Sequence, residues 1–323
     1  MGTDIELEMN RRLSSKTVIG AGLMGHGIAQ IFASRPGVVR LYDISDEILE
    51  IALNRIRSSL KMFARHGLIA DGEVGTCMDR LYPTTVLEEA VEDASFVVEA
   101  APEELSIKQE LFEIIDKIAP DEAILATNTS GFRIGDVSKK VRYKERVVGS
   151  HFFLPAQVIP LIEVSRGSLT SDRTMDITIE LWKSFGKEPV RLEYDVPGYI
   201  ANRLQGAIVR EATSLLSKGI ATAEDIDRAV RMSFGLRYLV SGPLEQRDLG
   251  GLDLHVKLGT ALWPTLDVSP GPHQFVKDMV DEGKLGLKTG QGFIDWSGLD
   301  PEEVRESKTE ALIKLMSKIK EQD

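Results

Sequence analysis

The fold of this chain is decided by residues 16–30, KTVIGAGLMGHGIAQ. Residues 17–19 form a short, largely β-branched run, which is typical of a buried strand. The run stops at Gly20, and the stretch GAGLMG then opens an apolar segment with helical spacing. A strand, a glycine-rich turn and a helix in this order form the context in which G-x-G-x-x-G is informative, because glycines alone occur in many turns.

Each glycine of this motif has its own task in a phosphate-binding turn. Gly20 permits the tight turn, Gly22 lets the backbone approach a pyrophosphate, and Gly25 lets the helix pack close to the strand. The N–H groups at the start of the helix, around Leu23 and Met24, face the phosphates.

The second strand, residues 38–43 (VVRLYD), ends on an acid. We expect Asp43 to accept hydrogen bonds from the ribose 2′- and 3′-hydroxyls, and its charge would repel a 2′-phosphate. The sequence therefore predicts NAD as the cofactor rather than NADP. A merely structural glycine turn is the weaker alternative, because the strand, the helix, the acid and the position near the N-terminus all agree.

Composition bounds the class of protein. The 323 residues are 42% hydrophobic, which suffices for two domains, and the net charge of −11 argues against nucleic acid as a partner. The single cysteine, Cys77, excludes an intramolecular disulfide and fits a cytoplasmic location. The N-terminal segment lacks the apolar core of a signal peptide, and no apolar run reaches the ~20 residues of a membrane span.

Strands and helices alternate along the first part of the chain. Further strands are expected at residues 82–86, 95–100, 123–127, 146–151, 158–164 and 187–192. This alternation predicts an α/β fold: a Rossmann domain (1–195) with a parallel, doubly wound sheet and ligands beyond the carboxyl ends of its strands. Residues 45–81 are expected to form a helical hairpin that projects from the sheet.

After residue 195 the sequence predicts helices only. Residues 199–216, 223–232, 252–262 and 274–282 have helical spacing, so residues 196–323 are expected to form an all-helical substrate and dimerisation domain. A last helix starts near Pro301 and carries an apolar stripe of Val304, Leu312, Leu315, Met316 and Ile319. We expect it to pack on its own domain, and we expect the protein to be a homodimer.

Polar residues stand where this sheet would deliver a substrate. Ser130 follows one strand, His151 ends the next, and Glu163 lies inside the apolar run after it. If residues 152–160 fold back, Glu163 reaches His151, and the pair becomes a general base with a carboxylate that orients it. Asn202 could hold His151 or the substrate oxygen from the other side.

Each of these residues also has a structural interpretation. His151 could be a satisfied core residue, Glu163 could lie on an edge, and Ser130 could cap a helix. Asn202 could be an ordinary polar helix residue. The other histidines have no acidic neighbours at the spacing of metal ligands, so no metal site is predicted.

Longer motifs carry a resemblance to a known family. They are GAGLMGHGIAQ (20–30), VVEAAPEELSIKQELF (97–112), ATNTSGFRIGDVS (126–138), GSHFFLPAQVIPLIEV (149–164), DVPGYIANRLQGAIVREA (195–212), GPLEQRDLGGLD (242–253) and KLGLKTGQGF (284–293). On these motifs the chain resembles the L-3-hydroxyacyl-CoA dehydrogenase family over nearly its whole length.

The resemblance implies roles for individual residues. It implies His151 as the general base, Glu163 as its partner, and Ser130 and Asn202 as groups that orient the substrate. It further implies that Glu103, Lys108 and Asn128 line the cofactor. The hairpin at 45–81 would contact the CoA moiety, with Ser59 on the family's serine.

Departures from the family pattern leave the substrate open. His66 stands where the family usually has a lysine that meets CoA, and Leu154 replaces an asparagine near the site. Residues 236–245 (LRYLVSGPLE) are similar to the branch of λ-crystallin and L-gulonate 3-dehydrogenase, which acts on free hydroxy acids. The planar guanidinium of Arg237 would suit a substrate carboxylate, or it could form a structural ion pair.

The favoured prediction is an NAD-dependent enzyme that oxidises an L-3-hydroxyacyl-CoA. Such an enzyme would act in fatty acid metabolism. The first alternative is a dehydrogenase of a free 3-hydroxy acid, such as gulonate or carnitine. A more distant alternative is a non-catalytic, crystallin-like protein that binds NAD. That alternative is the weakest, because every predicted catalytic position keeps a competent residue.

Overall fold

The computed structural model describes residues 14–320. Most of the N-terminal segment for which a signal peptide was excluded lies outside the described residues. Among the residues described, no helix combines the length and the apolar character that a membrane span requires.

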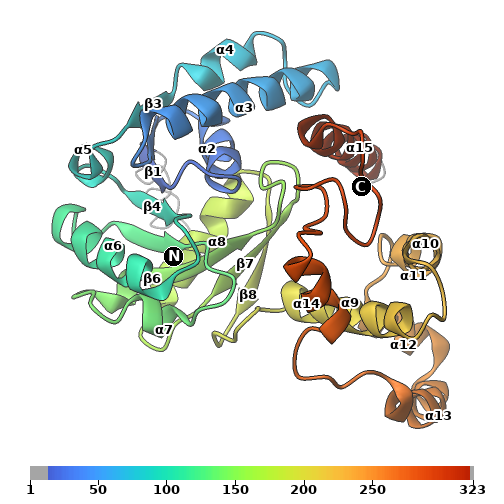
Figure 1. The fold of residues 1–323 in the computed structure, drawn as a ribbon. Coiled ribbons are helices and arrows are strands. Elements are labelled where there is room, and N and C mark those ends of the chain that lie inside the picture. Colours follow the sequence, from blue (N-terminus) through green and yellow to red (C-terminus); the bar gives the residue numbers. More distant parts are fainter. Residues whose placement is uncertain (1–13, 321–323) are drawn as a thin grey trace. The chain divides into compact units, whose positions relative to one another are not determined.

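One eight-stranded sheet organises the first part of the chain (Figure 1). Its strand order is β3-β2-β1-β4-β5-β6-β7-β8. The strands are β1 (Ser15–Ile19), β2 (Val38–Tyr42), β3 (Leu81–Thr84), β4 (Phe96–Glu99), β5 (Ile124–Thr127), β6 (Val147–Phe152), β7 (Leu161–Ser165) and β8 (Glu188–Leu192). The order reverses between β1 and β4, which is the point where ligands bind in open α/β sheets.

The predicted parallel arrangement holds for β1 to β6 but not for the pairing of β7 with β6. β7 runs antiparallel to β6, and β8 runs parallel to β7. The cause is the length of the connection, because residues 153–160 are too few for the crossover that two parallel strands need. The antiparallel register brings His151 directly opposite Glu163.

Helices cover both faces of the sheet, and each face has its own apolar core. One core joins β-strand residues to α2, α3 and α8, and the other joins them to α5, α6 and α7. The helices of this part are α2 (Gly25–Ala33), α3 (Asp46–Arg65), α4 (Glu73–Met78), α5 (Leu87–Val91), α6 (Leu105–Ile118), α7 (Ile134–Val137), the 3-10 turn η1 (Lys144–Arg146) and α8 (Asp172–Ser184).

The second arm of the predicted hairpin is shorter than expected. The pattern predicted helix over residues 68–81, whereas α4 covers only Glu73–Met78. The backbone reverses at Gly67, whose φ is +70°. The N–H of Ala70 then donates to Glu73 Oε2 (2.8 Å), a side-chain bond that fixes where the short helix can begin.

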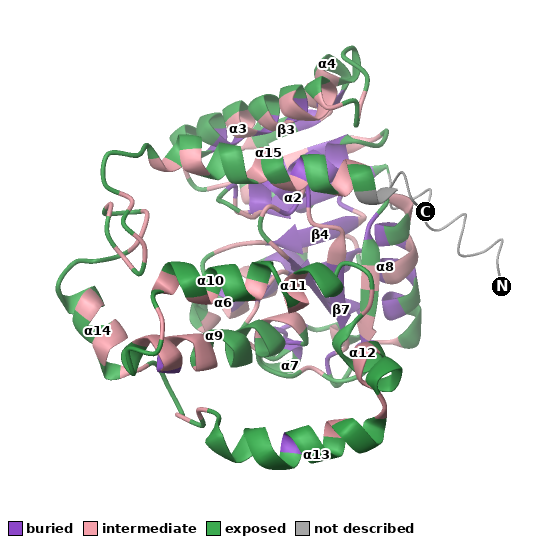
Figure 2. Ribbon diagram, turned by 90° about the vertical axis from the view of Figure 1, so that its right-hand side faces the viewer, coloured by how far each residue is buried: buried purple, intermediate pink, exposed green. Residues whose placement is uncertain are grey.

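The second part of the chain contains helices and, among its described residues, only isolated β-bridges. Its helices are α9 (Ala201–Ser217), α10 (Ala223–Arg231), α11 (Phe234–Arg237), α12 (Pro243–Gly250), α13 (Leu252–Leu262), η2 (Trp263–Thr265), α14 (Gln274–Asp281) and the start of α15 (Pro301–Lys320). Burial differs sharply from the first part: purple fills the sheet in Figure 2, and green dominates these helices.

The described residues form two compact units, 14–200 with 307–320, and 201–306. The division between residues 200 and 201 falls a few residues after the boundary predicted at 195/196. The last helix was expected to pack on the second domain, and the structure differs there. Most of α15 groups with the first unit, not the second. Ile313 is its buried apolar residue and lines a cavity together with Leu60 of α3, whereas Leu315 of the predicted stripe is exposed. The side chain of Ile319 lies outside the described residues.

Candidate active site

The glycine-rich turn has the geometry that its sequence predicts. Gly20 has a φ of +94°, and a Cβ there would lie 2.6 Å from the carbonyl oxygen of Ala100. A Cβ on Gly25 would lie 1.6 Å from the Gly20 oxygen. Helix α2 can therefore pack this close to the turn only because residue 25 is a glycine. A Cβ on Gly22 would meet nothing within 4 Å, and Leu23 beside it is half exposed. The backbone here is open to an approaching phosphate.

Asp43 lies at the carboxyl end of β2, beside this turn. Its Oδ2 accepts a hydrogen bond from the N–H of Ala21 (2.7 Å), and its Oδ1 accepts one from Ile44 (2.8 Å). A carboxylate oxygen can accept more than one hydrogen bond, so both oxygens can still accept from a ribose. The turn, the start of α2 and Asp43 therefore fit the pyrophosphate and ribose of a dinucleotide.

A buried ion pair lies at the end of strand β4, which pairs with β1. Glu99 Oε1 accepts from Lys108 Nζ and from the N–H of Ala101, each at 2.7 Å. Glu99 Oε2 accepts from the hydroxyl of Thr127 on β5 (2.6 Å). Glu99 and Lys108 are at most 1% exposed. Burial raises the pKa of Glu99, and the charge and hydrogen bond of Lys108 oppose that rise.

The same lysine reaches a second carboxylate, which holds the loop after β5. Lys108 Nζ lies 3.2 Å from Glu103 Oε2. Glu103 Oε1 accepts from the hydroxyl of Thr129 (2.6 Å) and from the N–H groups of Ser130 (3.0 Å) and Gly131 (2.8 Å). Burial pushes the pKa of Glu103 upward, but these donors and Lys108 outweigh it and leave the pKa below its usual value. The loop that carries Ser130 is thus fixed by an ionised carboxylate.

Asn128 links this loop to β6. Its Oδ1 accepts from the N–H of Phe152 (2.9 Å), and its own N–H donates to the Glu99 carbonyl (2.8 Å). Phe152 directly follows His151. The ends of β4, β5 and β6 are therefore tied together at the edge of the sheet where ligands bind.

His151 and Glu163 are in contact. His151 Nδ1 lies 2.8 Å from Glu163 Oε2 across the β6–β7 pair, and the side chains are 6% and 1% exposed. A carboxylate at this position stabilises the tautomer with hydrogen on Nδ1, which leaves Nε2 as the basic nitrogen. The predicted contact required residues 153–160 to fold back. The antiparallel pairing of β7 with β6 provides this fold-back.

Tyr199 and Ile200 complete the surroundings of this pair. The N–H of Ile200 donates to Glu163 Oε1 (2.8 Å), so both carboxylate oxygens are engaged. The ring of Tyr199 packs against the His151 ring, with centroids 5.1 Å apart. Tyr199 has a φ of +47°, which is uncommon for a residue with a side chain. That conformation turns the next peptide N–H toward Glu163, and burial raises the pKa of the Tyr199 phenol above its usual value.

The remaining predicted residues belong to other elements of the chain. Asn202 is in α9 and belongs to the second unit, as does Arg237, at the end of α11. The Arg237 side chain is exposed and has no ion pair among the described residues. Ser59 of α3 has its hydroxyl engaged by the Gln157 amide (3.3 Å), and His66 Nε2 lies 3.0 Å from Glu310 Oε1 of α15.

Two parts of the cluster were missed by the sequence analysis. Glu99 was counted only as a strand residue, although a carboxylate in the apolar run FVVEA is the same signal that singled out Glu163. Tyr199 carried no such signal, because a tyrosine after Pro-Gly is typical of an ordinary turn.

Across residues 14–320, no group of three or more His, Cys, Asp or Glu side chains could hold a metal ion.

Comparisons with known proteins agree with this geometry. Residues 15–196 match the family model of the 3-hydroxyacyl-CoA dehydrogenase NAD binding domain, and residues 198–296 match the model of that family's C-terminal domain. The mitochondrial hydroxyacyl-coenzyme A dehydrogenase of Homo sapiens is 36% identical over 288 residues, 87% of this chain and 90% of that protein. The 3-hydroxybutyryl-CoA dehydrogenase of Clostridioides difficile is 32% identical over 281 residues, 87% of this chain and 98% of that protein.

Solved structures show the same fold. A 5-formyl-3-hydroxy-2-methylpyridine 4-carboxylic acid 5-dehydrogenase, described as an NAD+ dependent dismutase, matches with a TM-score of 0.88 and 28% identity, over 95% of this chain and 98% of that chain. FadB2 of M. tuberculosis matches with a TM-score of 0.74 and 32% identity, over 88% of this chain and 99% of that chain.

The sequence-based recognition is therefore confirmed at the level of the family, the fold class and the cofactor. The matched N-terminal model is an NAD-binding domain, and the open turn at Gly22 and the position of Asp43 fit that cofactor. The chain belongs to the 3-hydroxyacyl-CoA dehydrogenase family and is an NAD-dependent oxidoreductase that acts on a secondary alcohol.

Proposed function

We propose that the chain catalyses the reversible oxidation of an L-3-hydroxyacyl-CoA to the 3-oxoacyl-CoA. The observation that carries this proposal is the buried pair of His151 and Glu163 at the ligand-binding edge of the sheet. A chain of this family needs a base at this edge, since the hydroxyl proton must be accepted when the carbon is oxidised. NAD, when bound, supplies the acceptor for the hydride.

In this mechanism His151 Nε2 takes the proton of the 3-hydroxyl group. Glu163 stabilises the charge that the ring gains, and it is itself held by the N–H of Ile200 (2.8 Å). Ser130 and Asn202 orient the substrate oxygen. In the reverse direction the charged His151 returns the proton to the oxygen that forms.

We further propose that Glu103 and Asn128 line the cofactor, with Leu23 and Met24 at the start of α2. Lys108 would act through Glu103, because its side chain is only 1% exposed and its ammonium group is bonded to Glu99. Asp43→Ala tests the dinucleotide half of the site. We expect the preference for NAD over NADP, measured as a ratio of kcat/KM values, to fall at least tenfold. An unchanged ratio would clear Asp43 of this role.

The activity itself is tested by steady-state assays with NAD and 3-hydroxybutyryl-CoA, and with NADH and acetoacetyl-CoA for the reverse. We expect turnover in both directions. A protein that binds NAD but oxidises neither an acyl-CoA nor a free hydroxy acid would contradict the proposal and favour the crystallin-like alternative.

A second candidate is a dehydrogenase of a free hydroxy acid. The dehydrogenase named for a pyridine carboxylic acid matches this chain with a TM-score of 0.88, against 0.74 for FadB2. Two residues of the predicted CoA-contacting hairpin, Ser59 and His66, are already bonded to Gln157 and Glu310. The side chain of Arg237 is exposed and could bind the carboxylate of a free hydroxy acid. If it does so, Arg237→Ala raises KM for free 3-hydroxybutyrate, gulonate or carnitine and leaves acyl-CoA kinetics unchanged.

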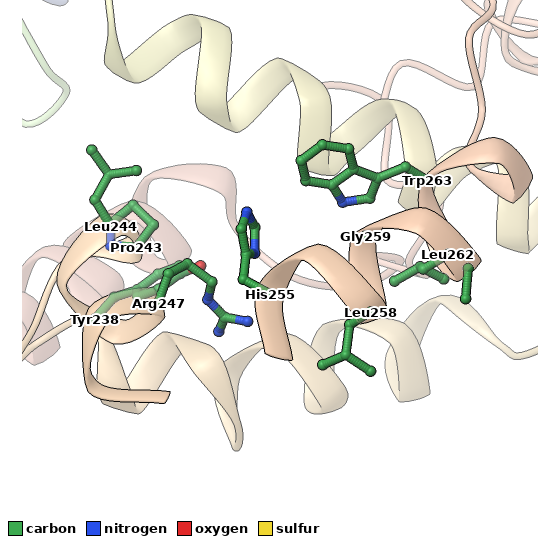
Figure 3. Close-up of a pocket in the computed structure, with 10 residues that line it drawn as sticks. Tyr238, Pro243, Leu244, Arg247, His255, Leu258, Gly259, Leu262 and Trp263 are labelled. Carbon is green, nitrogen blue, oxygen red and sulfur yellow. The ribbon is translucent and has the colours of Figure 1, made fainter. Parts of the chain in front are cut away.

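We propose that the protein works as a homodimer through its second unit. Within residues 201–306 only Ser214 and Gly259 are buried. This unit therefore has no buried apolar side chain. Val240, Leu244 and Leu249 are each more than three-quarters exposed. An open hollow of ≈ 690 Å³ lies in this unit, and Figure 3 shows His255 between Arg247 and Trp263 there. Apolar surface of this extent marks an interface.

Light scattering after size exclusion tests the dimer. We expect the wild type to have twice the mass of the chain and Leu244→Asp to shift toward the monomer. Leu169→Asp is the matched control, because Leu169 is an exposed leucine of the first unit. A monomeric wild type at micromolar concentration would contradict the proposal.

A cytoplasmic location and a role in fatty acid metabolism complete the proposal. The support for the location is Cys77, the single cysteine, which is a buried free thiol. Fractionation of cells that produce the full chain would test it, with recovery in an oxidising compartment as the contradicting result.

A further inference from the structure

One short turn, residues 196–200, contacts three of the residues assigned to catalysis. The N–H of Gly198 donates to the carbonyl oxygen of Ser130 (3.0 Å). The N–H of Ile200 donates to Glu163 Oε1 (2.8 Å). The residue between these two donors packs against the third catalytic side chain, the imidazole on β6. The turn therefore reaches the loop after β5 and both strands of the β6–β7 pair.

The backbone of this turn has an uncommon conformation. Gly198 has a φ of +80° and Tyr199 has a φ of +47°. Glycine adopts a positive φ freely, but a residue as bulky as tyrosine rarely does. Such a conformation persists only where the surrounding structure holds it, and residues of this kind cluster at functional sites. The contacts of the Tyr199 side chain are therefore the place to look for a role.

The Tyr199 side chain lies along one face of the β6–β7 pair. Its ring centroid is 5.1 Å from that of His151, and the two ring planes make an angle of 32°. A Cβ on Gly149 would lie 3.2 Å from the Tyr199 hydroxyl, so glycine leaves room for the phenol. Gly149 and His151 are two residues apart and face the same side of β6, where they pair with Ser165 and Glu163. The ring thus extends along this face to the imidazole.

The phenol group itself is not equipped for proton transfer. Tyr199 is 1% exposed, and its hydroxyl makes no hydrogen bond with a described residue. Burial raises the pKa of the phenol, and the negative charges of Asp195, Glu103 and Glu163 raise it further. The hydroxyl therefore stays neutral. What Tyr199 contributes to the site is its ring and its backbone conformation.

We infer that Tyr199 is a positioning residue for the reaction, an inference that rests on the proposed function. Its ring restricts the imidazole of His151 to the orientation in which Nδ1 meets Glu163 and Nε2 remains available to the substrate. The ring of Phe153 contacts the same imidazole edge-on, with centroids 4.7 Å apart. A base that is already fixed by packing reaches the transition state with less loss of freedom. Without the Tyr199 ring, His151 can turn away from its carboxylate partner.

Three variants separate the ring from the hydroxyl, the backbone and general stability. Tyr199→Phe keeps the ring and removes only the hydroxyl. Tyr199→Gly removes the ring but permits the left-handed backbone, so the bond from Ile200 to Glu163 is kept. Phe112→Ala is the matched control. Phe112 is also 1% exposed, but it packs in the core that contains α5, α6 and α7.

Steady-state kinetics with NAD and 3-hydroxybutyryl-CoA measure the effect on the full-length protein. Tyr199→Gly should lower kcat about ten- to hundredfold, because the base is no longer held in place. KM and the dissociation constant of NAD should stay near their wild-type values. Tyr199→Phe should keep wild-type kcat. Phe112→Ala should lower the melting temperature and leave kcat unchanged, as a merely structural role of Tyr199 would also do.

The imidazole itself gives a readout that does not depend on turnover. Long-range ¹H–¹⁵N NMR distinguishes the two tautomers of a neutral histidine, and the His151 signals are those that His151→Gln lacks. In wild type and in Tyr199→Phe we expect the tautomer with hydrogen on Nδ1, which Glu163 stabilises. In Tyr199→Gly we expect a mixture of the two tautomers.

Several results would overturn this inference. They are wild-type kcat in Tyr199→Gly, a loss in Tyr199→Phe as large as that in Tyr199→Gly, an equal loss in Phe112→Ala, or the wild-type tautomer in Tyr199→Gly. Failure of the proposed function would look different. In that case the wild type itself would not turn over, while the imidazole spectra would still report on Tyr199.

Discussion

The two units of this chain differ in which side chains they bury and which they expose. The first unit buries charge: Lys16, Glu99, Lys108, His151 and Glu163 are all at most 4% exposed. The second unit exposes leucine, valine and tryptophan, and its own histidine–carboxylate pair is less deeply buried. That pair joins His273 Nε2 to Asp267 Oδ2 at 2.9 Å, with the His273 side chain 18% exposed.

The difference separates two uses of the same residue types. In the first unit two apolar cores enclose the sheet, so a charge can be held dry where its interactions are strong. In the second unit the helices lack such a core within a single chain. An imidazole beside a carboxylate is therefore not a catalytic signal by itself. Its burial at the carboxyl end of a strand is what makes the first pair a candidate base.

The largest effect that would test this contrast is on turnover. His151→Gln removes the base and should lower kcat by about 10²–10⁴-fold, while NAD still binds. The matched control is His273→Gln, which removes the imidazole of the other pair and should leave kcat unchanged. Steady-state kinetics and NAD titration measure both. Full activity in His151→Gln would remove it as the base, and equal losses in the two variants would break the comparison.

The next effect concerns the carboxylate partners. Glu163→Gln keeps an acceptor for Ile200 but no longer stabilises a charged His151, so we expect kcat to fall about 10²-fold. Asp267→Asn is the control in the second unit and should retain wild-type kcat. The pH profile of kcat should change in Glu163→Gln alone. Wild-type kcat in that variant would mean that the carboxylate does not assist the base.

A third, smaller effect concerns the membership of α15 in the first unit. Ile313 is 1% exposed and Leu315, two residues on, is 40% exposed. Ile313→Ala should lower the free energy of unfolding by about 2 kcal/mol, the low end of the range for such changes, because a cavity already adjoins the side chain. Leu315→Ala should cost much less. Urea unfolding measures both, and equal costs would contradict the packing of α15 on this unit.

The smallest effect concerns a buried charge and depends on pH. Burial, with a lesser contribution from Arg80, lowers the pKa of Lys16 from 10.5 to about 8. Between pH 8 and 10.5 the unfolded chain binds more protons, so this residue makes stability rise with pH there. Lys16→Met should raise the free energy of unfolding by about 1–2 kcal/mol at pH 7, after loss of the bond to the Pro36 carbonyl.

That gain should shrink as the pH approaches 10.5. Urea unfolding at pH 7 and pH 10 measures it, with Lys61→Met, at an exposed lysine of α3, as the control. A gain that is the same at both pH values would show that the charge of Lys16 is not the cause.

Much of the fold was predictable because its signals are local. The glycines at 20 and 25 are required by backbone contacts a few residues away, and Asp43 follows its strand directly. The contact of His151 with Glu163 was also within reach, because residues 153–160 allow little besides a fold-back. The stripe predicted for the last helix was wrong at Leu315, which is exposed, and it omitted Ile313, which is buried. Apolar spacing alone does not say which face of a helix meets a neighbour.

The sequence by itself determined the Rossmann unit, the dinucleotide turn, the family and the candidate base. Each of these depends on backbone conformation or on neighbours along the chain. Only the tertiary structure decided the link from Glu99 through Lys108 to Glu103, the unit to which α15 belongs, and the packing of Tyr199 on His151. These features join residues that are remote or on different elements. Their burial and hydrogen bonding depend on how the elements pack, which no local pattern encodes.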